Sequence, residues 1–99
     1  MAKTFRGKIC GEYLDAIASG KRTFDLRLDA GQNPGDVLIL MEWDGTQYTG
    51  RWVKCKITYV LRDCAECGLN PHYCVMGINV LFADLDSFSD LEERYGFGD

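Results

Sequence analysis

The chain has 99 residues, which is the length of one domain. Hydrophobic residues make up 46% and charged residues 26%, as in an ordinary globular protein, and no apolar run approaches the ~20 residues that a membrane-spanning helix needs. The formal net charge of −4 excludes a strongly basic nucleic-acid-binding protein, and an N-terminus without an apolar segment leads us to expect a cytoplasmic protein with no membrane partner.

The negative charge is concentrated near the end of the sequence. Residues 84–99 contain six acids and one base, whereas residues 1–83 contain nine acids and ten bases. The first part is therefore nearly neutral, and the acidity belongs to the second part. We divide the chain into a domain, residues 1–83, and an acidic C-terminal helix or tail, residues 84–99.

The N-terminal third predicts a strand, a helix and a second strand. The first strand is expected over Thr4–Cys10, and the helix over Glu12–Ser19, where apolar residues recur at helical spacing. Gly20 suits the left-handed position that ends a helix, and the second strand follows over Thr23–Leu28. The residues expected on the core-facing stripe of the helix are Tyr13, Leu14, Ile17 and Ala18.

Side chains in this second strand alternate in chemistry. Because successive side chains of a strand point to opposite faces, its apolar and polar residues are expected on opposite sides. One side then carries Phe24, Leu26 and Leu28, and the other carries Thr23, Asp25 and Arg27.

The rest of the chain predicts three more strands. Val37–Trp43 is the most apolar segment and is expected at the centre of the sheet. A hairpin loop opens at Asp44–Gly45 and leads to a long strand, Arg51–Leu61. A loop over Arg62–His72 precedes the last strand, Tyr73–Phe82. The apolar residues that alternate with Trp52, Lys54 and Lys56 along the long strand are Val53, Cys55, Ile57, Tyr59 and Leu61.

The segment Ser89–Glu92 matches a capping box, which predicts a short C-terminal helix. The side chains that could dock it on the domain are Leu85, Phe88, Leu91 and Tyr95. Five strands with few helices and short hairpins indicate an α+β fold. We therefore expect a small mixed β-barrel with one N-terminal helix and a short C-terminal helix.

Three pieces of the chain together resemble a known family. They are the strand and helix of residues 8–27, the strand of residues 35–44, and residues 48–61 with a closing segment at 73–78. With these pieces the chain resembles a small ASCH domain of the PUA-like superfamily, in a branch found in phages and bacteria. The resemblance implies a pseudo-barrel with a cleft beside the helix, where RNA or a nucleotide would bind.

Some relatives in that superfamily are amidohydrolases that act on acetylated cytidine and use a Lys, a Thr and a Glu. By the resemblance, that Lys falls on Arg22 and that Thr on Asp25. A guanidinium stays protonated and cannot act as a base, and a carboxylate cannot replace a hydroxyl nucleophile. We therefore expect no catalytic residue, with hydrolysis of a modified nucleoside kept as an alternative function.

Candidate ligand-binding residues surround the expected cleft. In the functional interpretation they contact phosphates and bases, and Trp52 stacks on a base because it shares a predicted face with Lys54 and Lys56. In the structural interpretation Asp25 and Arg27 form an ion pair within the sheet, Lys21 and Arg22 only cap the helix, and Trp52 is partly buried. The candidates are Lys8, Lys21, Arg22, Thr23, Asp25, Arg27, Arg51 and Trp52.

Five cysteines, an odd number in an expected reducing compartment, favour free thiols or a metal site over disulfides. The loop offers Cys64, Cys67, His72 and Cys74, a valid donor set for tetrahedral zinc. Alternatively, the two loop cysteines are ordinary thiols, with redox activity as one role, and Cys74 is a buried strand residue. Apart from this zinc site we expect no cofactor.

These observations lead to two main hypotheses. The first is a non-catalytic module that binds nucleic acid or a nucleotide, with RNA as the expected partner. The second is a phage-type inhibitor that binds a basic host protein through the acidic surface of residues 84–99. The expected target is a host protein that processes nucleic acid.

Overall fold

The computed structural model of the chain describes residues 1–87. The C-terminal helix predicted around Ser89–Glu92 lies outside the described residues. Within residues 1–87, no helix is long and apolar enough to cross a membrane. The elements in chain order are β1 (Thr4–Ile9), α1 (Gly11–Ala18), β2 (Phe24–Leu28), β3 (Val37–Trp43), β4 (Tyr48–Leu61), the 3-10 helix η1 (Ala65–Cys67) and β5 (Tyr73–Asp84).

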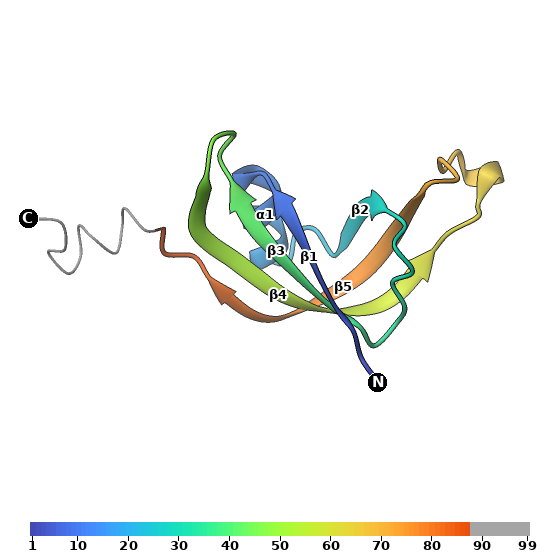
Figure 1. The fold of residues 1–99 in the computed structure, drawn as a ribbon, viewed down its shortest axis with the longest axis horizontal. Coiled ribbons are helices and arrows are strands. Elements are labelled where there is room, and N and C mark those ends of the chain that lie inside the picture. Colours follow the sequence, from blue (N-terminus) through green and yellow to red (C-terminus); the bar gives the residue numbers. More distant parts are fainter. Residues whose placement is uncertain (88–99) are drawn as a thin grey trace, which may run out of the picture.

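The five strands form one curled sheet in the order β1-β3-β4-β5-β2. The pair β1–β3 is parallel, and the pairs β3–β4, β4–β5 and β5–β2 are antiparallel. Figure 1 shows the sheet bent like a trough, with α1 on its concave side. The α+β class is confirmed, and the described residues form an open half-barrel with β1 and β2 at its two edges.

The central strand is β4, whereas the sequence favoured β3 because of its apolar composition. β4 has 14 residues and pairs along its length with both β3 and β5. A strand of that length can form two long ladders, so length rather than apolarity decides which strand lies in the middle.

The core lies between α1 and the concave face of the sheet. Leu14 and Ile17 of the helix are fully buried there, in one cluster with inward side chains of β1, β3, β4 and β5. Tyr13 was expected on the same stripe, but it is 49% exposed. A helix of eight residues turns only about twice, so just two large apolar side chains face the sheet.

The alternation predicted for β4 is confirmed in its first half and wrong in its second. Val53, Cys55 and Ile57 are fully buried, as expected. A register irregularity between Ile57 and Tyr59 then shifts the pairing by one residue. Because the side-chain period of a strand is two, this bulge turns Tyr59 outward and brings Val60 against the core.

The alternation predicted for β2 is confirmed, but its orientation is unusual. Asp25 faces the interior with 2% of its surface exposed, while Phe24, Leu26 and Leu28 face solvent. A strand beside a core normally does the reverse. The interior side of β2 therefore needs partners for its charge.

We predict that Leu14→Ala lowers the free energy of unfolding by about 3 kcal/mol, because it leaves a cavity between α1 and the sheet. The matched control is Tyr13→Ala on the same helix. Tyr13 contacts the Arg22 guanidinium, 4.4 Å from its ring centroid, so its removal should cost less than about 1 kcal/mol. Urea unfolding followed by circular dichroism measures both values, and equal losses would contradict the core assignment.

Candidate functional site

Two guanidinium groups hold the buried carboxylate of Asp25. Arg22 Nη2 lies 3.2 Å from Asp25 Oδ1, and Arg27 Nε donates to Asp25 Oδ2. The Arg22 Nε also donates to the Phe24 carbonyl at 3.0 Å, which fixes its side chain against the start of β2. Both cations are thereby committed to groups of the protein itself.

Arg27 also connects the two edges of the sheet. Its Nη2 donates to the backbone carbonyl of Lys8 on β1, with an N–O distance of 2.6 Å. The guanidinium lies over Gly7, where a Cβ would clash with it. Gly7 is therefore the residue that makes room for a side-chain bridge between β2 and β1, which share no backbone pairing in the described sheet.

Burial is the main influence on the pKa values of two groups inside the sheet, Asp25 and Cys55. Desolvation raises the pKa of Asp25 above its ordinary value of 3.8, although the charges of Arg27 and Arg22 act in the opposite direction. Burial, together with the nearby Asp25, raises the pKa of Cys55 to about 11. The Cys55 thiol is therefore protonated at neutral pH and unsuited to act as a nucleophile.

A hollow of about 380 Å³ opens beside the bridge, between β1 and β2. Its walls include Phe5 and Arg6 from β1, Leu26 and Arg27 from β2, and Tyr73 at the start of β5. The Arg27 of this hollow is already bonded to Asp25 and to the β1 backbone. No residue of α1 lines it, so it is not the cleft expected beside the helix. That place is taken by a smaller hollow of about 240 Å³, where the end of α1, Arg22 and Thr23 face residues 78–80 of β5.

Arg51 belongs to a separate network at the other end of the sheet. Its Nη1 lies 2.9 Å from Glu42 Oε2, and its Nη2 pairs with Asp15 of α1. Thr49 donates its hydroxyl to Glu42 Oε1 at 2.6 Å. Sequence reasoning missed Glu42, although a single acid within the apolar run of Val37–Trp43 is a signal for a buried, paired charge.

The outer face of the sheet, opposite α1, carries a different set of groups. The register aligns Arg6, Ile39, Lys54 and Phe82 in one row across four strands. The adjacent row contains Lys8, Met41, Trp52 and Asp84. A third row aligns Lys56 with Val37 and Asn79, so basic side chains recur in three successive rows.

Aromatic rings lie among these cations. Lys8 Nζ is 3.8 Å from the centroid of the Trp43 ring, and the rings of Trp52 and Phe82 are 5.2 Å apart. Phe82 is half exposed, and Trp43 and Trp52 are half-buried. We call this region the basic–aromatic face and define it by Arg6, Lys8, Lys54, Lys56, Trp43, Trp52 and Phe82.

The cations of the basic–aromatic face differ from the arginines elsewhere. Within residues 1–87, no carboxylate is in ion-pair contact with Arg6, Lys54 or Lys56, whereas Arg22, Arg27, Arg51 and Arg62 are all paired. Free positive charge is therefore concentrated on the outer face.

The predicted ligand-binding residues thus separate into groups. Arg22, Asp25 and Arg27 come together and neutralise one another, and Arg51 lies in another network. Lys21 and Thr23 are exposed near the end of α1 and join neither. Trp52 shares the outer face with Lys54 and Lys56 as expected, and Lys8 joins them there. Sequence reasoning missed Arg6 and Phe82, because only the strand order brings them into the row of Lys54, with Ile39 between Arg6 and Lys54.

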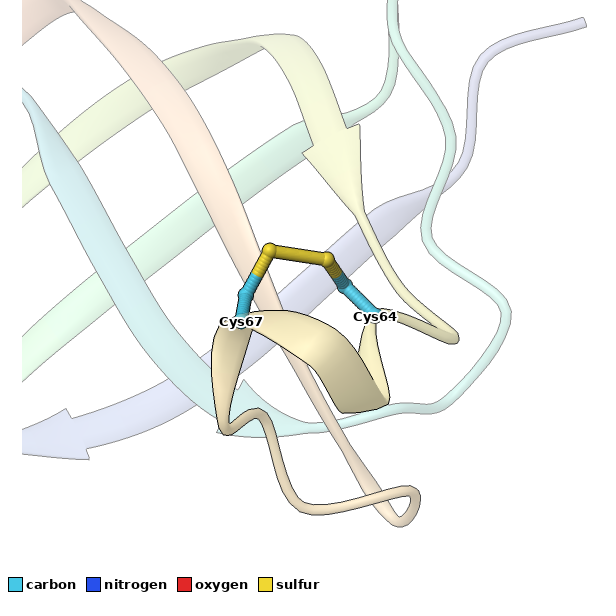
Figure 2. Close-up of a disulfide and its surroundings, with 2 residues drawn as sticks. All are labelled: Cys64 and Cys67. Carbon is cyan, nitrogen blue, oxygen red and sulfur yellow. A yellow bond between two sulfur atoms is a disulfide. The ribbon is translucent and has the colours of Figure 1, made fainter.

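Zinc is not indicated by the structure. Cys64 and Cys67 form a disulfide, drawn in Figure 2, so the expectation of free thiols is wrong for this pair. Cys74 is buried in β5, where its thiol contacts Gln32 Oε1 at 3.6 Å. Within residues 1–87, the potential metal ligands that cluster are Cys64, Glu66 and Cys67, without His72 or Cys74, and a disulfide leaves no thiolate to bind a metal.

Comparison with known proteins identifies a family. Residues 4–78 match the family described as Domain of unknown function (DUF3850). The chain is also similar to the uncharacterized 12.9 kDa protein in GpA 3'region of Escherichia phage P2, with 39% identity over 61 residues. The matched segment is 61% of this chain and 56% of that relative, so the chain spans just over half the length of the phage protein.

We predict that Gly7→Ala destabilises the fold by about 1–2 kcal/mol, because the new methyl group displaces the Arg27 guanidinium from the Lys8 carbonyl. In an Arg27→Ala background the same substitution should cost less than about 0.5 kcal/mol, because the clash is gone. Urea unfolding of the four proteins measures this cycle. An equal cost in both backgrounds would show that the strain is in the backbone.

We predict a pH dependence from the raised pKa of Asp25. Between 3.8 and the pKa of the folded state, the folded chain binds more protons than the unfolded chain, so stability falls as pH rises through that window. The wild type should therefore lose stability relative to Asp25→Asn as pH rises, measured by denaturant unfolding. The opposite trend would show that the two guanidiniums outweigh burial.

Proposed function

We propose a binding function for this chain, which belongs to the DUF3850 family. The protein is a non-catalytic module that binds single-stranded nucleic acid, with RNA as the expected ligand, on the basic–aromatic face. The observation that carries the proposal is an alignment on one sheet face: cations that have no carboxylate partner within residues 1–87 lie in adjacent rows with partly exposed rings.

This arrangement suits a single strand for two reasons. Within residues 1–87 the basic side chains of this face have no carboxylate partner, so they can attract the phosphate backbone without breaking an ion pair among the described residues. Rings such as those of Phe82 and Trp52 offer surfaces on which bases stack, whatever the base. A sheet face with cations beside rings can therefore follow an extended strand without forming a deep pocket.

The Asp25 network is assigned a structural role within this proposal. Its two guanidiniums are bonded to one carboxylate, so a phosphate would have to compete with an existing buried ion pair. We therefore place the binding surface on the outer face rather than around the expected cleft. Of the predicted ligand-binding residues, Lys8 and Trp52 belong to this surface.

A non-catalytic role also fits the resemblance to ASCH domains of the PUA-like superfamily, which we retain as part of the proposal. Arg22 and Asp25 stand where hydrolytic relatives have a Lys and a Thr, and here they form an ion pair with each other. The Arg27 bridge between the edge strands is the kind of contact that would close a pseudo-barrel of that superfamily.

We predict that the protein binds fluorescent oligouridine with an affinity that falls as salt rises. Lys54→Gln and Lys56→Gln should each weaken binding several-fold at low salt and reduce the slope of log K against log salt by about 0.7. Phe82→Ala should weaken binding by about 1–3 kcal/mol through lost stacking. Anisotropy measures the affinity, and quenching of the two tryptophans reports contact with Trp43 and Trp52.

The matched control is Lys21→Gln, which removes an exposed positive charge outside the basic–aromatic face. It should leave the affinity unchanged. The proposal fails if oligouridine does not bind at low ionic strength, or if Lys21→Gln weakens binding as much as Lys54→Gln does. A single-stranded DNA of matched length tests the preference for RNA, and equal affinity would remove that preference.

A further inference from the structure

The outer face has a second region that the proposed function does not use. Next to the basic–aromatic face, the register aligns Phe24, Gly77 and Tyr59 across β2, β5 and β4. The next row with outward side chains contains Leu26, Val75 and Leu61, and Leu28 lies opposite Tyr73 beyond it. We call these eight residues the apolar strip, and they include no charged residue.

The large side chains of the apolar strip are unusually exposed. Tyr59 is 64% exposed and Leu28 62%, and Phe24 and Leu26 are each 49% exposed. Single apolar side chains on a surface are ordinary, but a continuous uncharged patch marks an interaction site. The patch lies on β2, a strand at the edge of the sheet, where natural proteins usually place charges to prevent association.

The inverted orientation of β2 makes this exposure informative. The inward placement of Asp25 and Arg27 is explained by the bridge to β1. Because side chains alternate, that placement forces Phe24, Leu26 and Leu28 outward. The ring of Phe24 lies against the Arg22 guanidinium, 4.9 Å from its centroid. The bridge would work equally well with polar residues at Leu26 and Leu28, and within residues 1–87 it does not account for their apolar character.

We propose that the apolar strip is the interface of a symmetric homodimer of this chain. A two-fold axis through the strip brings the same uncharged patch of two copies together, so no charge is desolvated and no like charges meet. Gly77 has no side chain of its own between Phe24 and Tyr59, and the Thr58 hydroxyl lies over it, 2.9 Å from where a Cβ would stand, so the row presents the Phe24 and Tyr59 rings at its two ends.

The area available is sufficient for a dimer of modest affinity. Covering the exposed parts of the strip on both copies removes on the order of 1,000 Å² from water, at the lower limit of specific interfaces. We therefore expect dissociation in the micromolar range. Lys54 and Lys56 lie outside the strip, so the dimer inference does not depend on the proposed nucleic-acid binding.

The test is sedimentation velocity of the full chain from about 1 to 500 μM, without nucleic acid. The protein carries Cys10→Ser, because the exposed Cys10 thiol could cross-link two copies. We expect a concentration-dependent shift from the monomer mass to the dimer mass. Leu26→Asp should weaken the dimer at least 100-fold, because each interface then buries two unpaired carboxylates.

The matched control is Asn79→Asp, which introduces the same side chain at an exposed position of β5 outside the strip. It should leave the dimer affinity within about threefold, since it lies outside the buried patch. Circular dichroism shows whether each variant is folded, and Tyr59→Asp replaces Leu26→Asp if that variant is not. A monomer at all concentrations, an assembly larger than a dimer, or a dimer unaffected by charge in the strip would each overturn the inference.

Discussion

The structure depends on the Arg27 side chain, which connects the two edge strands, β1 and β2, in place of backbone hydrogen bonds between them. The sheet begins with β1 and ends with β2, and neither edge pairs with the other through its backbone. Arg27 spans the gap, held by Asp25 on its own strand and bonded to the Lys8 carbonyl on the other. A guanidinium suits this task because its donors are planar and fixed, so one group can serve a carboxylate and a carbonyl together.

This bridge determines the chemistry of both faces of the sheet. On the concave side it requires a buried acid, so the charges there are paired and unavailable to a ligand. On the outer side it leaves apolar residues of β2 exposed, and the lysines of β4 have no carboxylate partner within residues 1–87. The two faces therefore have separate roles: the concave face stabilises the fold, and the outer face supplies the surfaces for which we propose functions.

The sequence predicted the five strands and the first helix to within a few residues, because their periodicities and turn residues are local signals. It also predicted the shared face of Trp52, Lys54 and Lys56, because alternation within one strand needs no knowledge of partners. It did not predict that Arg6 and Phe82 lie in the row of Lys54, because that depends on strand order. Nor did it predict the outward turn of Tyr59, because one bulge reverses the alternation of everything after it.

The order of the strands also has a consequence for how the chain reaches this structure. β3, β4 and β5 follow one another and pair as neighbours, so they can assemble through short connections. β2 is translated early but pairs with β5, the last strand to be translated. Pairing them therefore brings together two segments separated by about half the chain, which is a slow, entropically costly step. During synthesis on the ribosome, β2 therefore has no strand to pair with until Tyr73–Asp84 has emerged. The hydrogen bond from Arg27 to the Lys8 carbonyl, which joins the two edge strands, is then among the last contacts to form.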